Sequence, residues 1–218
     1  MKERIVRQVV AFGIVMMAGS FLTGCLSPRV PEGPIHTYML ARGEREGEGN
    51  PAGTKREAQG TLLVNMPRAE PGFDSPRMVY ISRPFELSYY ATNQWAENPA
   101  RMLATLLVQS LEQSGTWRAV VHVPTSVKGD YRLDSQGLVL QQEFLQQPSR
   151  VRLAVRLQLV ALGDQKVVGT KWFELLEPAE SEDAYGGVLA ANRAVEHLLD
   201  QATVWVTSCM REGPPKRC

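Results

Sequence analysis

The nonapeptide VRLAVRLQL, residues 151–159, decides the fold of this chain. Its odd-numbered positions are all Val or Leu, whereas Arg152, Arg156 and Gln158 occupy even-numbered positions. A period of two is typical of a strand with one buried face and one solvent-facing side. The pair Gly163-Asp164 follows as a turn, so residues 166–176 are expected to return as the partner strand of a hairpin. The chain therefore needs further elements to cover the apolar face of this hairpin.

Two amphipathic helices are predicted to provide that cover. The first begins at Asn98 and Pro99, because an Asn cap followed by proline in the first turn is a favourable helix start, and it ends near Gly115. The second follows the capping residues 181–183. In both segments apolar residues recur at spacings of three and four, which is the period of a helix with one buried face.

Strand-length apolar segments lie on both sides of the first helix. They are residues 35–40, 61–66, 78–82 and 85–90 before it, the last two being either two strands or one strand broken at Pro84, and residues 117–123 and 131–144 after it. The order strands, helix, strands, helix predicts an α+β fold. We expect an α/β sandwich in which both long helices pack on one face of a largely antiparallel, mixed sheet.

The N-terminus has the composition of an export signal. Lys2, Arg4 and Arg7 precede an apolar run, and no charged residue follows before Arg29. The run ends in Leu-Thr-Gly-Cys at residues 22–25, which looks like a bacterial lipobox. An uncleaved transmembrane anchor is the alternative, but the apolar run is shorter than the roughly 20 residues that a spanning helix needs.

The lipobox predicts how the mature protein begins. Cleavage falls between Gly24 and Cys25, so residues 1–24 are a signal peptide that is absent from the mature chain. The Cys25 sulfur carries diacylglycerol and its amino group an N-acyl chain, and two or more acyl chains give stable membrane attachment. The proline-rich residues 25–34 then form a stiff tether.

Length and charge restrict the remaining chain. One domain is expected over residues 35–206, with a Gly-rich, charged loop at 42–60 and a C-terminal tail at 207–218. The full sequence has 24 basic and 23 acidic residues. This balance provides no basic surface for nucleic acid.

Catalytic and metal-binding motifs are missing from the sequence. His36, His122 and His197 do not have the spacing of metal ligands, and neither a G-x-S-x-G elbow nor a Walker or G-x-G-x-x-G motif occurs. Gly186 and Gly187, at the start of the second helix, would suit an anion, although tight helix packing explains them equally well. We therefore expect a protein that binds or assembles, with no enzyme activity, metal or soluble cofactor.

Two cysteines lie near the C-terminus. In an oxidising compartment Cys209 and Cys218 can form a disulfide that closes a small terminal loop. Free thiols and an intermolecular bond are equally compatible with the sequence.

Six segments together resemble one protein family, the ABC-type transport auxiliary lipoproteins, or PqiC-like lipoproteins, over residues 35–206. They are TLLV at 61–64, PGFDSPRMVY at 71–80, ELSYYATNQWA at 86–96, RML at 101–103, YRL at 131–133 and GGVLAAN at 186–192. The resemblance implies an outer-membrane lipoprotein that faces the periplasm and has no enzyme activity.

The resemblance also implies partners. Members act beside MCE-domain proteins and inner-membrane ABC permeases or transporters in intermembrane lipid transport, and a homo-oligomeric ring is implied as well. Leu26, next to Cys25, differs from the aspartate that signals inner-membrane retention, which favours the outer membrane. A periplasmic lipid or ligand carrier, with a closed apolar cavity, is the alternative function, and a periplasmic hydrolase is a weaker one.

Three aromatic residues ahead of the first helix are candidate partner contacts. Tyr89, Tyr90 and Trp95 qualify because aromatic side chains are enriched at protein interfaces. The alternative is that they pack over the entry to that helix.

Overall fold

The computed structural model describes residues 33–43, 59–212 and 218. The predicted signal peptide, the cleavage site at Gly24, the lipid attachment at Cys25 and the tether up to residue 32 lie outside the described residues. So do residues 44–58 of the predicted loop and 213–217 of the predicted tail. The account below concerns the unit that begins at Gly33.

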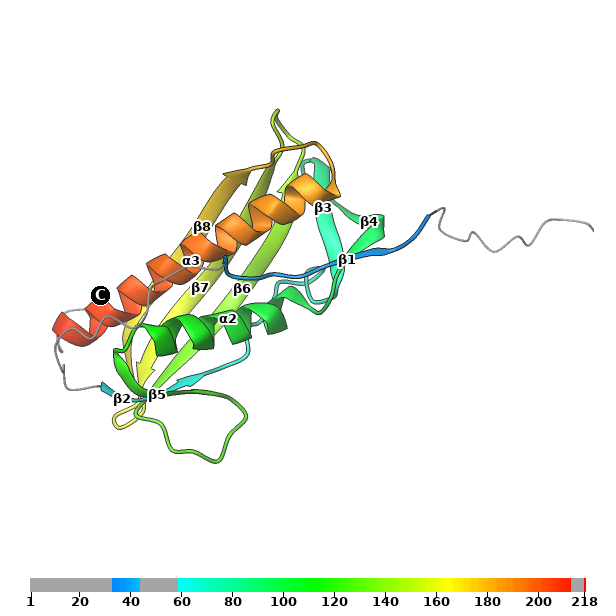
Figure 1. The fold of residues 1–218 in the computed structure, drawn as a ribbon. Coiled ribbons are helices and arrows are strands. Elements are labelled where there is room, and N and C mark those ends of the chain that lie inside the picture. Colours follow the sequence, from blue (N-terminus) through cyan, green and yellow to red (C-terminus); the bar gives the residue numbers. More distant parts are fainter. Residues whose placement is uncertain (1–32, 44–58, 213–217) are drawn as a thin grey trace, which may run out of the picture. The chain divides into compact units, whose positions relative to one another are not determined.

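Eight strands and two helices make up the described part of the chain (Figure 1). They are β1 (His36–Tyr38), β2 (Gln59–Val64), β3 (Arg77–Arg83), β4 (Glu86–Trp95), α2 (Pro99–Gln113), β5 (Trp117–His122), β6 (Tyr131–Glu143), β7 (Arg150–Ala161), β8 (Lys166–Pro178) and α3 (Ala184–Glu212). The α+β class is confirmed, and each predicted strand and helix corresponds to one observed element.

The sheet is mixed and is organised around β6. On one side β6 pairs with β7, and β7 with β8, in long antiparallel ladders. On its other side the two ends of β6 have different neighbours: β2 runs parallel to residues 131–133, and β3 runs parallel to residues 141–143. β5 lies beyond β2 and runs parallel to it. β4 lies beyond β3 and runs antiparallel to it, and β1 runs parallel to β4 at the edge.

The connection from β2 to β3 stays beside the middle of β6. The Asn65 amide donates to the Leu133 carbonyl at 3.0 Å, and the Arg68 amide donates to the Ser135 carbonyl at 2.9 Å. Further along the same connection, the Leu138 amide donates a hydrogen bond to the Arg68 carbonyl. Buried backbone groups need such partners, so β6 is satisfied along its length although β2 and β3 each pair with only part of it.

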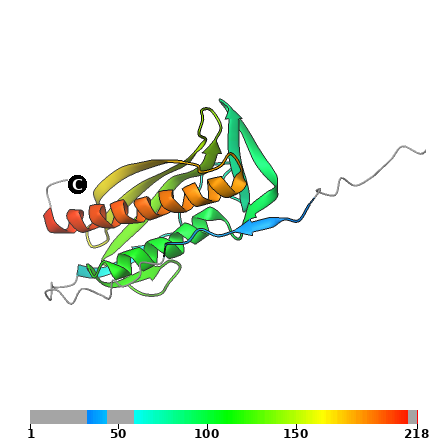
Figure 2. The ribbon, with the colours of Figure 1, turned by 45° about the horizontal axis from the view of Figure 1, so that its top comes forward.

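Both helices pack on the same face of the sheet, as the sequence predicted (Figures 1 and 2). Leu153, Val155 and Leu157 of β7 point to that face and are almost fully buried. Arg152 and Arg156 point to the opposite face, so the alternation of the nonapeptide separates the core from the uncovered side. Among the residues that the structure describes, no helix is long and apolar enough to cross a bilayer.

Side-chain caps explain where the helices begin. The side-chain carbonyl oxygen of Asn98 accepts a hydrogen bond from the Ala100 amide at 2.9 Å. Asn98 is the cap of α2 and directly precedes the proline at the first helical position. Asp183 accepts the Gly186 amide at 2.8 Å and so caps α3. These bonds satisfy amides that the helix itself leaves unpaired.

Candidate functional site

Two turns project from one end of the sheet. Because β3 and β6 run parallel, with Ile81 beside Glu143, the β3–β4 turn and the β6–β7 turn lie next to each other (Figure 2). The Phe144 amide donates to the Ile81 carbonyl at 2.8 Å and holds the two turns together. Residues 83–86 and 144–149 are called the turn end below.

The turn of residues 83–86 corrects one predicted boundary. Phe85 was expected to begin a strand, whereas it lies in the turn and β4 begins at Glu86. Its backbone has φ of +67°, a conformation that L residues rarely adopt, and Pro84 precedes it. Proline followed by a positive φ is the pattern of a type II turn, in which glycine normally holds the second place. In the sequence, Arg83-Pro84 indicated a turn, but Phe85 stands where the glycine typical of a type II turn would follow the proline.

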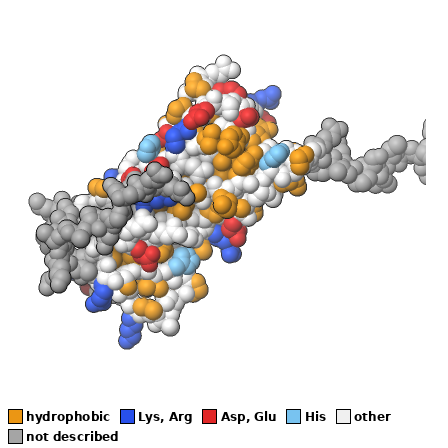
Figure 3. Space-filling model, in the orientation of Figure 1, with side chains coloured by type: hydrophobic (Ala, Val, Ile, Leu, Met, Phe, Trp, Pro, Cys, Tyr) orange, Lys and Arg blue, Asp and Glu red, His pale blue; other side chains and the backbone are white. Residues whose placement is uncertain are grey.

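Aromatic side chains gather beside the turn end. The ring centroids of Tyr80 and Tyr90 are 4.8 Å apart, and those of Tyr80 and Phe144 are 6.0 Å apart. A second contact joins Tyr38 of β1 to Tyr185 of α3 at 6.1 Å. Figure 3 shows hydrophobic side chains on the surface around the N-terminal part of α3. Partly exposed aromatic surface of this kind suits a binding role.

A buried chain of hydrogen bonds supports this region. The Tyr90 hydroxyl donates to Gln142 at 2.9 Å, the Gln142 amide donates to the Ser149 hydroxyl at 3.0 Å, and the Ser149 backbone amide donates to the Glu182 carboxylate at 2.8 Å. Burial, above all, raises the pKa of Tyr90, so its hydroxyl stays protonated and keeps donating. The network links β4, β6, the β6–β7 turn and the start of α3.

The Gly186-Gly187 pair has a packing role here. A Cβ on Gly187 would collide with the side chain of Gln142, and one on Gly186 would collide with the Ser181 backbone. The Gly186 amide is already bonded to Asp183, and this bond together with the Ser181 hydroxyl lowers the pKa of the Asp183 carboxyl. The protein's own carboxylate therefore occupies the place that an external anion would need.

The three predicted contact residues do not share one surface. Tyr89 and Tyr90 are consecutive in a strand and therefore point to opposite faces. The Tyr89 hydroxyl donates to the Gly72 carbonyl at 3.0 Å, and the Arg77 guanidinium lies 3.6 Å from the centre of its ring. Trp95 is only 4% exposed and belongs to the core, which agrees with the alternative interpretation for this residue.

The segment after β1 crosses the helical face and is bonded there. The Ala41 amide donates to the Asn192 side chain at 2.7 Å, and Asn192 in turn donates to the Met39 carbonyl at 3.3 Å. The Arg42 guanidinium lies 3.2 Å from Asp200 of α3. Asn192 is the last residue of the GGVLAAN segment, and the spacing of that segment did not predict a contact with Met39 and Ala41.

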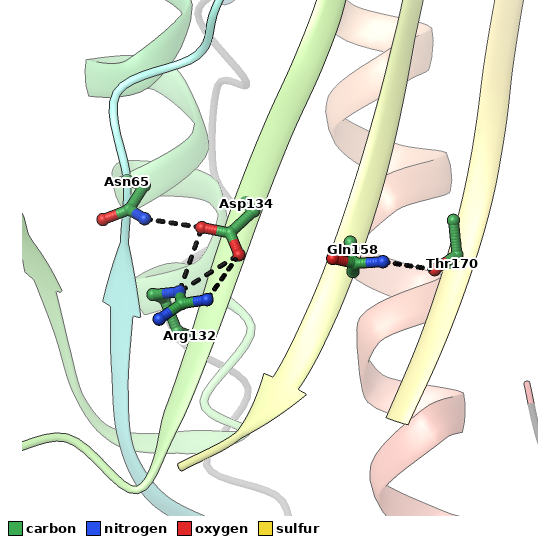
Figure 4. Close-up of polar contacts among 5 residues, drawn as sticks. All are labelled: Asn65, Arg132, Asp134, Gln158 and Thr170. Atoms are coloured by element: carbon green, nitrogen blue, oxygen red, sulfur yellow. Dashed lines mark hydrogen bonds and ion pairs between the residues drawn. The ribbon is translucent and has the colours of Figure 1, made fainter. Parts of the chain in front are cut away.

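The uncovered face of the sheet carries polar contacts (Figure 4) beside the exposed Trp172 and Leu176 of β8. Arg132 donates to both carboxylate oxygens of Asp134 at 2.9–3.0 Å, and Asp134 also accepts the Asn65 amide. On the neighbouring strands Gln158 donates to Thr170 at 3.0 Å. The first group thus joins the residue after β2 to β6, and the separate Gln158–Thr170 pair joins β7 to β8.

The three histidines lie on different elements, and His197 and the nearby Arg193 pair with carboxylates. His36 lies in β1, His122 ends β5, and His197 of α3 lies 2.7 Å from Glu177. Arg193 forms ion pairs on the same part of α3. In the described ranges, no group of three or more His, Cys, Asp or Glu side chains is placed to hold a metal ion.

The two C-terminal cysteines are joined within the chain. Cys209 and Cys218 form a disulfide with 5.2 Å between their Cα atoms. It lies against Gly169 of β8, where a Cβ would crowd the Cys218 sulfur. The last residue of the chain is thereby held beside the sheet.

One family model matches most of this chain. It is that of the ABC-type transport auxiliary lipoprotein component, and it matches residues 44–203. A comparison with curated proteins gave no match.

Solved structures share the fold. A Xanthomonas campestris protein of the DUF330 family is 24% identical, with a TM-score of 0.68 over 81% of this chain and 97% of its own. An uncharacterized protein is 12% identical, with a TM-score of 0.60 over 80% of this chain and 99% of its own. At these identities the likeness concerns the fold alone.

Proposed function

This chain belongs to the family of ABC-type transport auxiliary lipoprotein components, and we propose that it is a non-enzymatic part of an MCE-type intermembrane lipid-transport system. In this proposal the Cys25 lipid holds it at the periplasmic face of the outer membrane. The observation that carries the proposal is the family match over residues 44–203, which includes all described strands except β1, the whole of α2 and about two thirds of α3.

The small space between the sheet and α3 supports an adaptor over a lipid carrier. A carrier needs an enclosed apolar space for at least one acyl chain. Among the residues that the structure describes, the space lined by Met78, Trp95, Gly187 and Ala191 measures about 10 Å³. That volume admits no more than a water molecule. Lipid is therefore expected to pass beside this protein or through a partner.

The site geometry supports a role without catalysis. Activated carboxylates and nucleophiles in enzymes carry perturbed pKa values in a cleft. Here the lowered pKa of Asp183 comes from capping α3, and the raised pKa of Tyr90 comes from packing in the network. Both shifts thus have structural causes.

The proposed partners are an MCE-domain protein and an inner-membrane permease or ABC transporter. A homo-oligomeric ring of this chain is part of the proposal. Residues 39 and 41, which follow β1, are bonded to Asn192 of α3, so this N-terminal segment is fastened to the folded unit.

Purification from native membranes tests this function. The full chain with a C-terminal tag is cross-linked in cells and captured, and the bound proteins are identified by mass spectrometry. We expect an MCE-domain protein, an ABC permease, or both. The matched control is Cys25→Ala, which retains the signal sequence but lacks the acylated sulfur and should recover fewer of these partners. Recovery of neither partner class with the lipidated chain would contradict the proposal.

A further inference from the structure

Phe85 combines two unfavourable features at the tip of the turn end. Its side chain is 108% exposed, so the rest of the chain covers none of it. Its positive φ is a conformation that glycine adopts freely and that L residues adopt at a cost. A turn selected only for folding would carry glycine here. Local strain and an exposed aromatic ring at one residue point to a function for that side chain.

A second apolar side chain accompanies Phe85. Leu145, in the adjoining β6–β7 turn, is 47% exposed. The bond between Phe144 and Ile81 keeps the two turns together, so both apolar side chains project from the same end of the sheet. They extend from convex turns, which suits insertion into a soft surface better than docking into a rigid pocket.

A cation lies beside the apolar tip. The Arg83 side chain is 79% exposed, and its distance to the Glu86 carboxylate is 3.8 Å. Such an exposed pair contributes little, so the guanidinium is available for phosphate oxygens. Apolar residues with an adjacent Arg suit a lipid interface, because the Arg stem lies along apolar groups while its head remains among the headgroups.

The chain between Cys25 and β1 is long enough to reach the turn end. β1 runs parallel to β4, and His36 pairs with Asn93. β4 starts at the turn end, so β1 begins with its first residue toward that side. The distance along β4 from Glu86 to Asn93 is about 24 Å. The residues from Cys25 to His36 reach at most about 40 Å. A lipid on Cys25 can therefore hold the turn end at the bilayer surface.

We propose that the turn end is a membrane-contact site, in which Phe85 and Leu145 enter the headgroup region of the bilayer and Arg83 binds lipid phosphates. This inference rests on the lipid anchoring in the proposed function. It adds an orientation: the sheet stands with the β3–β4 and β6–β7 turns toward the membrane, and the β5–β6 loop points away.

Photo-cross-linking tests the contact. The full chain is produced with its own signal sequence, carries Phe85→p-benzoylphenylalanine, and is reconstituted into vesicles of phosphatidylethanolamine and phosphatidylglycerol. The control is Val127→p-benzoylphenylalanine, because Val127 is 49% exposed in the β5–β6 loop at the other end of β6. After irradiation, we expect phospholipid adducts at position 85 to exceed those at 127 by about tenfold. Equal yields, or adducts at 85 only to a second copy of the chain, would overturn the proposal.

A second variant keeps the fold intact. Phe85→Gly suits the positive φ, so its melting temperature should not fall. In that background, lipid adducts from Leu145→p-benzoylphenylalanine should fall by about threefold, because one of the two apolar contacts is gone. An unchanged yield would show that Phe85 does not hold the turn end at the bilayer.

The same samples separate the two proposals. Intact mass reports whether Cys25 is acylated. Acylated protein without lipid adducts at 85 would overturn the membrane-contact site and leave the transport function standing. An unmodified Cys25 would overturn the anchoring on which both depend.

Discussion

The two ends of β6 differ in where they place polar and apolar groups. At the turn end, Gln142 and Ser149 are buried and bonded, whereas Phe85 is exposed. At the opposite end, which we call the disulfide end, the apolar Cys209–Cys218 pair packs inward against β8. The disulfide end buries its sulfurs, although Val127 and Val167 are about half exposed there. The turn end differs in carrying a fully exposed aromatic ring on a residue with positive φ, and such departures from local rules mark functional regions more often than folding requirements.

The largest effect is expected from Gly187→Ala at the turn end. The added Cβ would collide with the side-chain oxygen of the buried Gln142, which accepts the Tyr90 hydroxyl, so the hydrogen-bond network would have to break or shift. We expect the free energy of unfolding to fall by about 2 kcal/mol, measured by urea denaturation.

A double-mutant cycle identifies the cause. Gln142→Ala removes the colliding group, so the double variant should lose less than the sum of the two single variants. Additive losses would mean that Gly187 is needed for another reason.

Asp183→Ala should cost about 1 kcal/mol at pH 7, because α3 loses its cap. The folded-state pKa of Asp183 is lowered from 3.8. Its contribution is therefore complete above pH 4 and is lost as the pH falls through the lower folded-state pKa. Unfolding curves between pH 7 and pH 2 should show wild type and variant converging at the acid end.

Asp183→Asn is the matched control for the cap. An Asn side chain accepts the same amide without a titrating charge, so this variant should retain only the neutral part of the cap at pH 7 and its difference from Asp183→Ala should not change with pH. A constant difference between Asp183→Ala and wild type at every pH would contradict the role of the carboxylate.

Gly169→Ala probes the disulfide end and should cost less, about 0.5 kcal/mol. The overlap of its Cβ with the Cys218 sulfur is smaller than the overlap of a Gly187 Cβ with Gln142. In a Cys209→Ser, Cys218→Ser background the cost should disappear. A penalty as large as that of Gly187→Ala would erase the contrast between the two ends.

Phe85→Gly should change stability no more than Gly169→Ala does, and in the opposite direction. Relief of the positive φ is partly offset by the backbone entropy of glycine, so a gain of about 0.5 kcal/mol is expected. Phe85→Ala, which keeps the strain, should bring no gain. A clear loss in both variants, measured by thermal unfolding, would mean that the ring stabilises the folded chain.

Much of the fold could be predicted from periodicity. The nonapeptide at 151–159 predicted β7, and the Asn98-Pro99 and 181–183 caps predicted both helix starts within a residue. Strand pairing was harder, because β2 and β3 share one edge of β6 and their parallel registers join segments far apart in sequence. No local pattern encodes which distant strand is the neighbour.

The candidate site was less predictable. Trp95 belongs to the core. Tyr90 takes part in a hydrogen-bond network with Gln142 and Ser149, and the sequence did not predict these two partners because polar residues in or beside a strand are common. Phe85 looked like the first residue of a strand, since the sequence around Pro84 fitted a broken strand as well as a turn. Its exposure depends on the direction in which the turn projects, which only the three-dimensional arrangement reveals.

The central claim is that this chain is a lipid-anchored component of an MCE-type lipid-transport system. Native mass spectrometry of the complex, extracted from its own membranes, tests it most directly. The predicted result is a mature chain that starts at acylated Cys25, bound in a fixed ratio to an MCE-domain protein. A chain that retains residues 1–24, or an acylated chain that is always recovered without such a partner, would contradict the claim.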